Sequence, residues 1–210
     1  MYDNDKLKIY YDAEFTGLRH DTSLISIGLV SESGNWFYAE FTDYDKTQVD
    51  DWLQQNVINN LCLTEEGVNY DCLSNQPPKP YCITILDTTE NIKNQLIHWL
   101  YTESTFMNKQ IQIYCDCYAY DWMLFNKLIC DDGLALNLPD FIYYIPMDLS
   151  TALQFNDIDP DITREEYLGK DGVEQLQTYD IFRSMGENCK HNSLWDAAVC
   201  MRCFVKLLMN

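Results

Sequence analysis

Three strand-forming segments near the start of the chain place the strongest constraint on its fold. Residues 7–13 read Leu-Lys-Ile-Tyr-Tyr-Asp-Ala and residues 24–30 read Leu-Ile-Ser-Ile-Gly-Leu-Val, and both are rich in residues that favour strands. A third segment, residues 36–41, follows directly after Ser-Gly-Asn, which is typical of a tight turn. We therefore expect the second and third segments to form a hairpin, so that the chain opens with three strands.

Helical patterns alternate with strand patterns through the rest of the chain. Apolar residues recur at helical spacing in residues 45–60, 89–102, 120–130, 148–155 and 193–208, and Asp148 is expected to cap the fourth of these helices. Strands are expected at residues 111–116 and 141–145, with at most one short strand, at 81–86, in a loop that contains Gln-Pro-Pro-Lys-Pro. Residues 156–189 are acidic and are expected to be irregular. This order of elements predicts an α/β fold in which helices flank a mixed five-stranded sheet.

The length and composition of the chain favour one folded, intracellular domain. A chain of 210 residues fits a single domain, residues 1–210, and 47% hydrophobic residues supply enough apolar surface for one core. No stretch approaches the roughly 20 apolar residues of a membrane span, and the residues after Met1 lack the apolar run of a signal peptide. We therefore expect a cytoplasmic protein that makes no membrane contact.

Nine cysteines are present, at positions 62, 72, 82, 115, 117, 130, 189, 200 and 203. Their odd number and the absence of paired Cys-x-x-Cys modules argue against a disulfide framework and against a zinc ribbon. Reduced, mostly buried thiols are expected instead. Cys200 and Cys203 fall on one face of the last helix, where we expect them to pack rather than to bind a metal ion.

Two carboxylates stand at the end of the first expected strand. Asp12 and Glu14 are two residues apart, so their side chains share one face of the strand. In α/β sheets, binding sites collect at the carboxyl ends of central strands. Two carboxylates held together repel each other unless a cation lies between them, and a hard divalent cation prefers such oxygen ligands. The alternative is that one or both side chains simply face solvent.

Three further features make a metal site the better interpretation. Thr16-Gly-Leu supplies a tight turn whose backbone can approach a ligand. Asp121 opens a helix, where the N-terminus stabilises a carboxylate. His191 stands five residues before Asp196 at the start of the last helix. Asp116 lies five residues before Asp121, and we assign it to the end of a strand and not to the metal ligands.

With these residues the chain resembles the DEDDh family of 3′-5′ exonucleases. In that family Asp-x-Glu supplies the first two acids, an Asp that opens a helix supplies the third, and His-x-x-x-x-Asp supplies a base and the last acid. Asp12-Ala-Glu14 is similar to the first motif, Asp121 to the second, and His191 with Asp196 to the third, in the family's order. The wider pattern resembles the branch that contains RNase AS and related phage exonucleases, and Asp12-Ala-Glu-Phe-Thr-Gly-Leu also resembles the start of oligoribonuclease.

The resemblance implies an RNase H-like fold and hydrolysis of a nucleic acid from its 3′ end, with release of one 5′-mononucleotide at a time. It also implies two divalent cations, Mg²⁺ or Mn²⁺. In this scheme Asp12 binds both cations, Glu14 and Asp196 share one of them with it, and Asp121 reaches the other directly or through water. His191 takes a proton from the attacking water.

The resemblance further suggests substrate contacts, a homodimer and a cellular location. Phe15, Thr16 and Leu18 follow Glu14, where members of the family stack against or wedge the last nucleotides. An aromatic side chain that stacks on a base contributes roughly 1 to 3 kcal/mol, but Phe15 is equally suited to a place in the core. Relatives of this kind are often homodimers, and the expected location is the cytoplasm of a bacterium or of a phage-infected host cell.

The charge of the chain limits how it binds nucleic acid. Fourteen Lys and Arg residues against 33 Asp and Glu residues give a formal net charge of −19, whereas nucleic acid is normally held by Lys and Arg. We therefore expect a grip on only the 3′ end of a single strand, through metals and stacking. RNA is favoured as the substrate. The alternatives are a 3′-5′ exodeoxyribonuclease, a non-catalytic acidic protein that mimics DNA, and a nuclease fold that has lost its activity.

Overall fold

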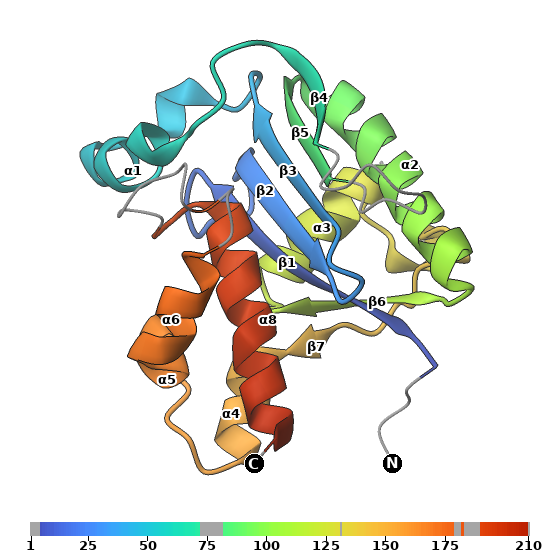
Figure 1. The fold of residues 1–210 in the computed structure, drawn as a ribbon. Coiled ribbons are helices and arrows are strands. Elements are labelled where there is room, and N and C mark those ends of the chain that lie inside the picture. The colour runs from blue at the N-terminus through green and yellow to red at the C-terminus, as the bar shows by residue number, and fades with distance from the viewer. Residues whose placement is uncertain (1–4, 72–81, 131, 179–181, 183–189, 210) are drawn as a thin grey trace.

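A seven-stranded sheet forms the centre of the protein, with the strand order β4-β5-β3-β2-β1-β6-β7 (Figure 1). The computed structural model describes residues 5–71, 82–130, 132–178, 182 and 190–209. The strands are β1 (Leu7–Phe15), β2 (Leu24–Ser31), β3 (Trp36–Phe41), β4 (Gly67–Asp71), β5 (Cys82–Asp87), β6 (Ile111–Cys115) and β7 (Met147–Asp148).

The sheet is mixed, as expected. β1 pairs antiparallel with β2 and parallel with β6. β2 and β3 form the expected antiparallel hairpin, and its turn contains Gly34, whose φ of +92° is strained for a residue with a side chain. β3 and β5 are parallel, β4 and β5 are antiparallel, and β6 and β7 are parallel. β1 therefore lies inside the sheet, between two strands that follow it in the chain.

Helices cover both faces of the sheet (Figure 1). They are α1 (Asp51–Asn56), α2 (Thr89–Met107), α3 (Asp121–Ile129), α4 (Leu149–Phe155), α5 (Arg164–Leu168), α6 (Lys170–Leu176) and α8 (Ser193–Met209). Helices α2 and α3 pack on one face in a cluster that includes Trp99 and Phe125. Helices α4, α5, α6 and α8 pack on the other face in a second cluster, which includes Leu149 and Phe204.

The alternation of side chains along β1 decides which face carries the acids. Ile9 and Tyr11 belong to the buried cluster on the α2 and α3 face. Tyr10 belongs to the cluster on the α8 face. Because side chains alternate along a strand, Asp12 and Glu14 point to the same face as Tyr10, toward α8.

The sheet has two strands more than the five expected. β4 forms inside a segment expected to be a loop, and the short strand expected at 81–86 is present as β5. The strand expected at 141–145 is instead an isolated bridge between Ile142 and Ile111, and β7 follows it. Pro146 lies between the bridge and β7, and because a proline has no N–H to donate it interrupts the ladder there.

The prediction of a single helix over residues 45–60 is wrong. The chain there forms two 3₁₀ turns, Lys46–Gln48 and Ile58–Asn60, on either side of α1. Asp45 accepts a hydrogen bond from the Thr47 N–H and Asp50 accepts one from the Leu53 N–H. Each of these caps starts a new turn, so the polar side chains divide a segment whose apolar spacing alone predicted one helix.

The acidic stretch 156–189 is more regular than expected. It contains α5, which the Thr163 hydroxyl caps at the Glu166 N–H, and α6. Tyr167 of α5 and Leu176 of α6 are buried against α8.

The expected cap at Asp148 is confirmed, because its carboxylate accepts a hydrogen bond from the Thr151 N–H at 2.7 Å.

Among the cysteines that the structure describes, seven are free thiols, and five of these are buried. Cys200 and Cys203 are both in the buried cluster around α8, which confirms that they pack. Cys72 and Cys189 lie outside the described residues. None of the helices in the described ranges combines the length and the apolar character that crossing a bilayer requires.

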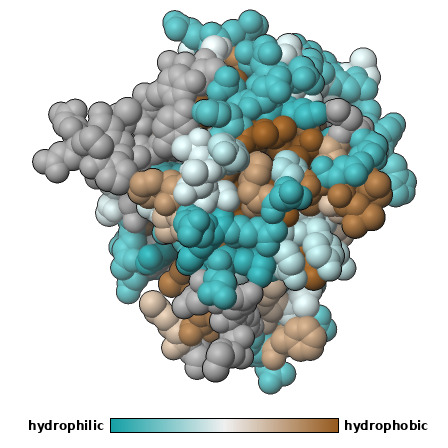
Figure 2. All heavy atoms as spheres, turned by 90° about the vertical axis from the view of Figure 1, so that its right-hand side faces the viewer, coloured by the Kyte–Doolittle hydropathy of each residue, from teal (hydrophilic) through white to brown (hydrophobic). Residues whose placement is uncertain are grey.

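The side of the molecule that carries α2 is largely hydrophilic, with apolar side chains gathered in its middle (Figure 2). Tyr101 and Phe106 of α2 are among the exposed apolar residues of the protein. The expected homodimer stays a prediction.

Candidate active site

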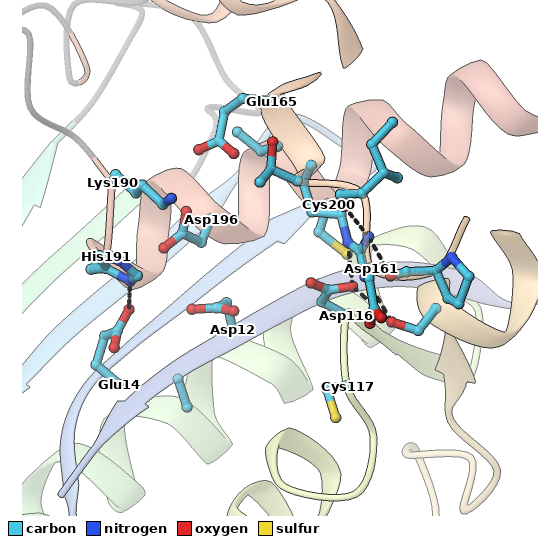
Figure 3. A pocket seen from close by; sticks show the side chains of 17 residues that line it. Asp12, Glu14, Asp116, Cys117, Asp161, Glu165, Lys190, His191, Asp196 and Cys200 are labelled. Carbon is cyan, nitrogen blue, oxygen red and sulfur yellow. Dashed lines mark hydrogen bonds and ion pairs between the residues drawn. The ribbon is translucent and has the colours of Figure 1, made fainter. Parts of the chain in front are cut away.

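A pocket of about 440 Å³ lies over the carboxyl end of β1, on the α8 face of the sheet (Figure 3). Its walls come from β1, the end of β6, the segment that leads into α5, and the start of α8. The charged residues that line it are Asp12, Glu14, Asp116, Asp161, Arg164, Glu165, Lys190, His191 and Asp196. Four of the five residues that the sequence assigned to catalysis therefore share one pocket.

Three of these side chains converge closely. Glu14 projects from β1, Asp196 from the first turn of α8, and His191 from the residues just before α8 (Figure 3). The His191 Nδ1 lies 3.9 Å from the Glu14 Oε1. One potential metal-ligand atom from each of Glu14, His191 and Asp196 lies within 4.8 Å of the others. Asp12 lies beside this group on β1.

The start of α8 is positioned by a close approach to β2. A Cβ added to Gly28 would lie 2.3 Å from the backbone of Ser193, so only glycine allows the helix to come so near. The Ser193 hydroxyl also lies 3.0 Å from the Ser26 hydroxyl of the same strand. Since Asp196 is in the first turn of α8, these contacts hold its carboxylate over the sheet.

Asn192 caps α8 and ties it to the centre of the sheet. Its Oδ1 accepts hydrogen bonds from the backbone N–H groups of Leu194 and Trp195. Its Nδ2 donates to the Tyr38 hydroxyl at 3.0 Å, and that hydroxyl donates to Glu40 at 2.7 Å. The chain of buried hydrogen bonds therefore fixes the residue that lies next to His191.

His191 itself is held from the opposite side by the segment around α1. Its backbone has a φ of +61°, a left-handed conformation that is unfavourable for histidine. The Asn60 Nδ2 donates to the Lys190 carbonyl at 2.8 Å, and the Trp52 ring packs edge-on against the imidazole with 5.3 Å between centroids. No sequence motif indicated these two residues.

The electrostatics of the pocket favour a bound cation. Burial raises the pKa of Asp12 and repulsion from Asp116 raises it further, and burial and Asp12 do the same for Glu14. Burial, then Asp12 and Glu14, raise the pKa of Asp196. Several carboxyl groups thus lie close together in a poorly solvated place. Carboxylate oxygens crowded in this way are a suitable ligand set for Mg²⁺ or Mn²⁺, whose charge would relieve the repulsion.

Asp121 lies behind the pocket rather than in its wall. It is 5% exposed, and its Oδ2 accepts a hydrogen bond from the Cys117 N–H at 3.2 Å. Burial raises its pKa, and Asp12 is the largest of the charges that raise it further. Its place at the start of α3, as expected, brings it close enough to interact with Asp12.

Asp116 follows directly after β6, at the strand end where it was expected, and it lines the pocket together with Asp12. The register of β1 and β6 explains this. Tyr11 is paired with Cys115, so the next residue of each strand, Asp12 and Asp116, lies at the same edge of the sheet. The sequence patterns could not supply this register.

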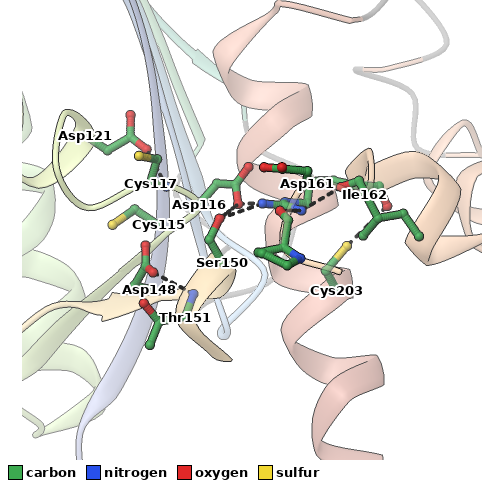
Figure 4. A network of polar contacts seen from close by, with 12 residues as sticks. Cys115, Asp116, Cys117, Asp121, Asp148, Ser150, Thr151, Asp161, Ile162 and Cys203 are labelled. Carbon is green, nitrogen blue, oxygen red and sulfur yellow. Dashed lines mark hydrogen bonds and ion pairs between the residues drawn. The ribbon is translucent and has the colours of Figure 1, made fainter. Parts of the chain in front are cut away.

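Arg164 lines the pocket, and no sequence motif indicated it. Figure 4 shows residues that it connects, among them Asp116, Ser150 and Ile162. Its guanidinium donates to the Asp116 Oδ1 at 2.6 Å, to the Ser150 hydroxyl at 2.7 Å, and to the carbonyls of Pro160 and Ile162. These bonds connect the segment before α5 to the end of β6 and to α4. An isolated arginine in an acidic stretch is the sequence signal that could have drawn attention to it.

The three residues expected to touch substrate have different surroundings. Phe15 is partly buried and stacks on Tyr120, with centroids 5.7 Å apart and 16° between the ring planes. Thr16 is 1% exposed, and its hydroxyl accepts the Ser23 N–H within the turn, so its side chain is used for folding. Leu18 is 73% exposed. Of the three, Leu18 is the one free to meet a ligand.

A comparison with solved structures identifies the fold. The nuclease domain of 3′hExo, a DEDDh family member solved bound to rAMP, matches with a TM-score of 0.55 and 12% sequence identity over 98% of this chain and 93% of that domain. The match shows that the chain has the α/β fold of that domain, and it confirms the expected RNase H-like fold with its mixed sheet and flanking helices.

Sequence comparison gives a shorter match. Two 3′-5′ exoribonucleases of Mycobacterium tuberculosis, MT2234.1 of strain CDC 1551 and Rv2179c of strain H37Rv, are each 36% identical to this chain over 55 residues. That stretch is 26% of this chain and spans only a third of the length of each relative, at 33%. No family model matches the chain.

Proposed function

We propose that the protein is a metal-dependent 3′-5′ exonuclease of the DEDDh type, which releases 5′-mononucleotides from the 3′ end of single-stranded RNA. The observation that carries this proposal is the convergence of Asp12, Glu14, His191 and Asp196 on one pocket. Asp12 and Glu14 are far from His191 and Asp196 in the sequence, yet all four side chains line the same pocket. Their order along the chain is the order of the family's motifs. The fold of a DEDDh nuclease domain and the short similarity to two exoribonucleases support the same activity.

The carboxylates would bind the cations, and the imidazole would accept a proton from the attacking water. Asp12, Glu14 and Asp196, with Asp121 behind them, would bind two Mg²⁺ or Mn²⁺ ions, whose charge stabilises the negative charge that develops at the phosphate. Burial and the nearby Lys190 lower the pKa of His191, although Glu165 opposes them, and a lowered pKa favours the neutral imidazole. A neutral imidazole at the pocket rim can accept a proton from the attacking water.

The preference for RNA depends on recognition of the 2′-hydroxyl, the group that distinguishes RNA from DNA. The turn after β1 is the expected place for this contact. The Thr16 N–H is already bonded to the Ser23 carbonyl at 3.0 Å, so Glu14 is the better candidate for reading the hydroxyl. One lost hydrogen bond to a charged group is worth roughly 1.5 to 3 kcal/mol, which predicts a rate difference of about 10-fold or more between RNA and DNA.

The decisive experiment uses matched RNA and DNA oligomers labelled at the 5′ end, incubated with Mg²⁺, Mn²⁺ or EDTA. We expect a ladder of RNA products that shortens from the 3′ end in either metal, no reaction in EDTA, and no reaction when the 3′ end is blocked. Equal or faster degradation of DNA would make the protein an exodeoxyribonuclease. Absence of hydrolysis under every condition would favour a non-catalytic acidic protein, and cleavage of a circular substrate would exclude an exonuclease.

A further inference from the structure

The group formed by Glu14, His191 and Asp196 differs from the set of carboxylates that the proposed mechanism needs. It contains an imidazole and leaves out Asp12. We infer that these three side chains form a site for a single transition-metal ion of the Zn²⁺ class, with the imidazole as a direct ligand, and that this ion switches the active site off. Binding of the ion follows from the positions of the three side chains, whereas inhibition of hydrolysis rests on the proposed function.

The distances suit a small ion with three protein ligands. The three ligand atoms lie within 4.8 Å of one another, and the His191 Nδ1 lies 3.9 Å from the Glu14 Oε1. Metal–ligand bonds of roughly 2.0 to 2.2 Å in a tetrahedral site place neighbouring ligand atoms about 3.3 to 3.6 Å apart. Small side-chain rotations therefore suffice to close the site. A fourth position would stay open to the pocket.

The imidazole is already oriented toward this position. The hydrogen bond from the Asn60 side chain to the Lys190 carbonyl and the edge of the Trp52 ring hold the His191 backbone and ring from one side. The cap at Asn192 holds the adjacent backbone from the other. Supporting contacts of this kind around a ligand histidine lower the cost of ordering it when a metal binds.

The chemistry of the ligands separates two classes of metal. Mg²⁺ prefers oxygen ligands in octahedral geometry and binds imidazole nitrogen weakly, so it would use the carboxylates and leave His191 free to accept a proton. Zn²⁺, Co²⁺ and Ni²⁺ bind imidazole nitrogen well and compete strongly with harder ions. An ion of this class would bind the His191 Nδ1, which faces Glu14, together with the carboxylates of Glu14 and Asp196. The base and two carboxylates would then be unavailable for hydrolysis.

The binding test uses the purified, metal-free protein and titrates Zn²⁺ by calorimetry, with Co²⁺ absorption spectra to report the ligands. His191→Ala should weaken Zn²⁺ binding by about 10-fold or more and change the Co²⁺ spectrum, because loss of a direct ligand exceeds the usual effect of a supporting residue. Glu14→Gln should weaken Zn²⁺ binding as well. His98→Ala, which removes an exposed imidazole on α2, is the matched control and should bind as the wild type does.

The functional test adds Zn²⁺ to the RNA reaction supported by Mg²⁺. Inhibition at Zn²⁺ concentrations that fill the calorimetric site supports the proposal. Equal Zn²⁺ affinity in the wild type and in folded His191→Ala protein would overturn it, whether or not RNA is hydrolysed. If Zn²⁺ binds through His191 but the wild type hydrolyses no nucleic acid, the metal site stands and the proposed function fails, so the two failures are distinguishable.

Discussion

The Asp12 carboxylate lies in a poorly solvated place among other acidic side chains. It lies beside Glu14 on β1 and shares the edge of the sheet with Asp116. Burial and then the charge of Asp116 oppose its ionisation, so an ionised Asp12 destabilises the protein unless a cation compensates. The same crowding that prepares the site for metal therefore lowers the stability of the metal-free protein.

Asp12→Asn should stabilise the protein without metal and remove its response to metal. Each kcal/mol of stability shifts the melting temperature of a chain of this size by about 2–4 °C, and we expect a rise of at least that amount in EDTA. Mg²⁺ or Mn²⁺ should raise the melting temperature of the wild type by mass action, but not that of the variant. Thermal unfolding with and without metal measures both effects. The exposed Asp140→Asn serves as the control, and a variant that kept the full metal-induced shift would contradict the assignment of Asp12 as a ligand.

His191→Ala should reduce turnover of RNA by about 10² to 10⁴ while substrate binding and the Mg²⁺-induced rise in melting temperature persist. The reason is that the imidazole accepts a proton and is not needed to bind Mg²⁺. Steady-state kinetics together with thermal unfolding in Mg²⁺ test this, and His98→Ala should behave as the wild type does. Unchanged turnover would show that another group is the base.

At the scale of elements, the segment around α1 contacts the residues just before α8. Asn60 lies in the 3₁₀ turn after α1, and its side chain bonds to a carbonyl 130 residues further along the chain. The backbone of His191 is strained, so it keeps its conformation only while neighbouring contacts hold it.

Asn60→Ala should therefore lower kcat with little change in KM. A displacement of the imidazole by about 1 Å can reduce the rate by roughly 10²-fold, and we expect a loss of about 10- to 100-fold. Asn59→Ala is a matched control, because Asn59 is adjacent and exposed, and its side chain accepts a hydrogen bond from the surface residue Gln54. A rise in KM at constant kcat would instead place Asn60 in substrate binding.

A second connection between elements is the bond of Arg164 to Asp116. Arg164→Met should destabilise the protein by about 1–3 kcal/mol, because it leaves the partly buried carboxylate of Asp116 without its charged partner. Lys170→Met is the comparison, because it breaks the ion pair between Lys170 and Glu174, whose side chains are 86% and 59% exposed, respectively. Loss of so exposed a pair should change stability little. Urea unfolding of the two variants gives the difference, and equal effects would mean that Arg164 does not stabilise the pocket wall.

At the scale of the whole molecule, the net charge of −19 and the acidic side chains that line the pocket make the free energy of unfolding depend on pH. Folding raises the pKa of Asp12 from 3.8 to about 8 and that of Glu14 from 4.5 to about 9, and burial is the main cause of both. A carboxyl with a raised pKa binds its proton more tightly in the folded state than in the unfolded state. Its contribution to stability is full below the unfolded pKa and is lost as the pH rises through the folded pKa.

The metal-free protein should therefore lose stability steadily between about pH 4 and pH 9, and metal should raise the melting temperature more at pH 8 than at pH 5.5. Melting curves in EDTA and in Mg²⁺ across this range provide the measurement, and Asp12→Asn should show a weaker dependence on pH. A melting temperature in EDTA that rose over the same range would refute the burial of these charges as the cause.

The parts of the fold that depend on local patterns could be predicted from the sequence. Alternation placed Asp12 and Glu14 on one face of β1, and helical spacing predicted both ends of α3 and α8 to within one residue. It also predicted the start of α2, which continues to Met107 rather than ending at residue 102. These patterns report the period and the preferences of neighbouring residues, which is information that a short segment contains. The family motifs added the expectation that His191 and Asp196 would join them.

Other features of the site follow from contacts between distant segments. Arg164 bonds to Asp116 across 48 residues, and Asn60 bonds to the Lys190 carbonyl across 130. The register that sets Asp116 beside Asp12 depends on how two strands pair, which no pattern within either strand records. The order of residues along the chain is therefore enough to identify the side chains that could do the chemistry and the face of their own element that they occupy. Which of these side chains meet depends on the folded chain, because only packing sets the register of β1 against β6 and the approach of α8 to Gly28.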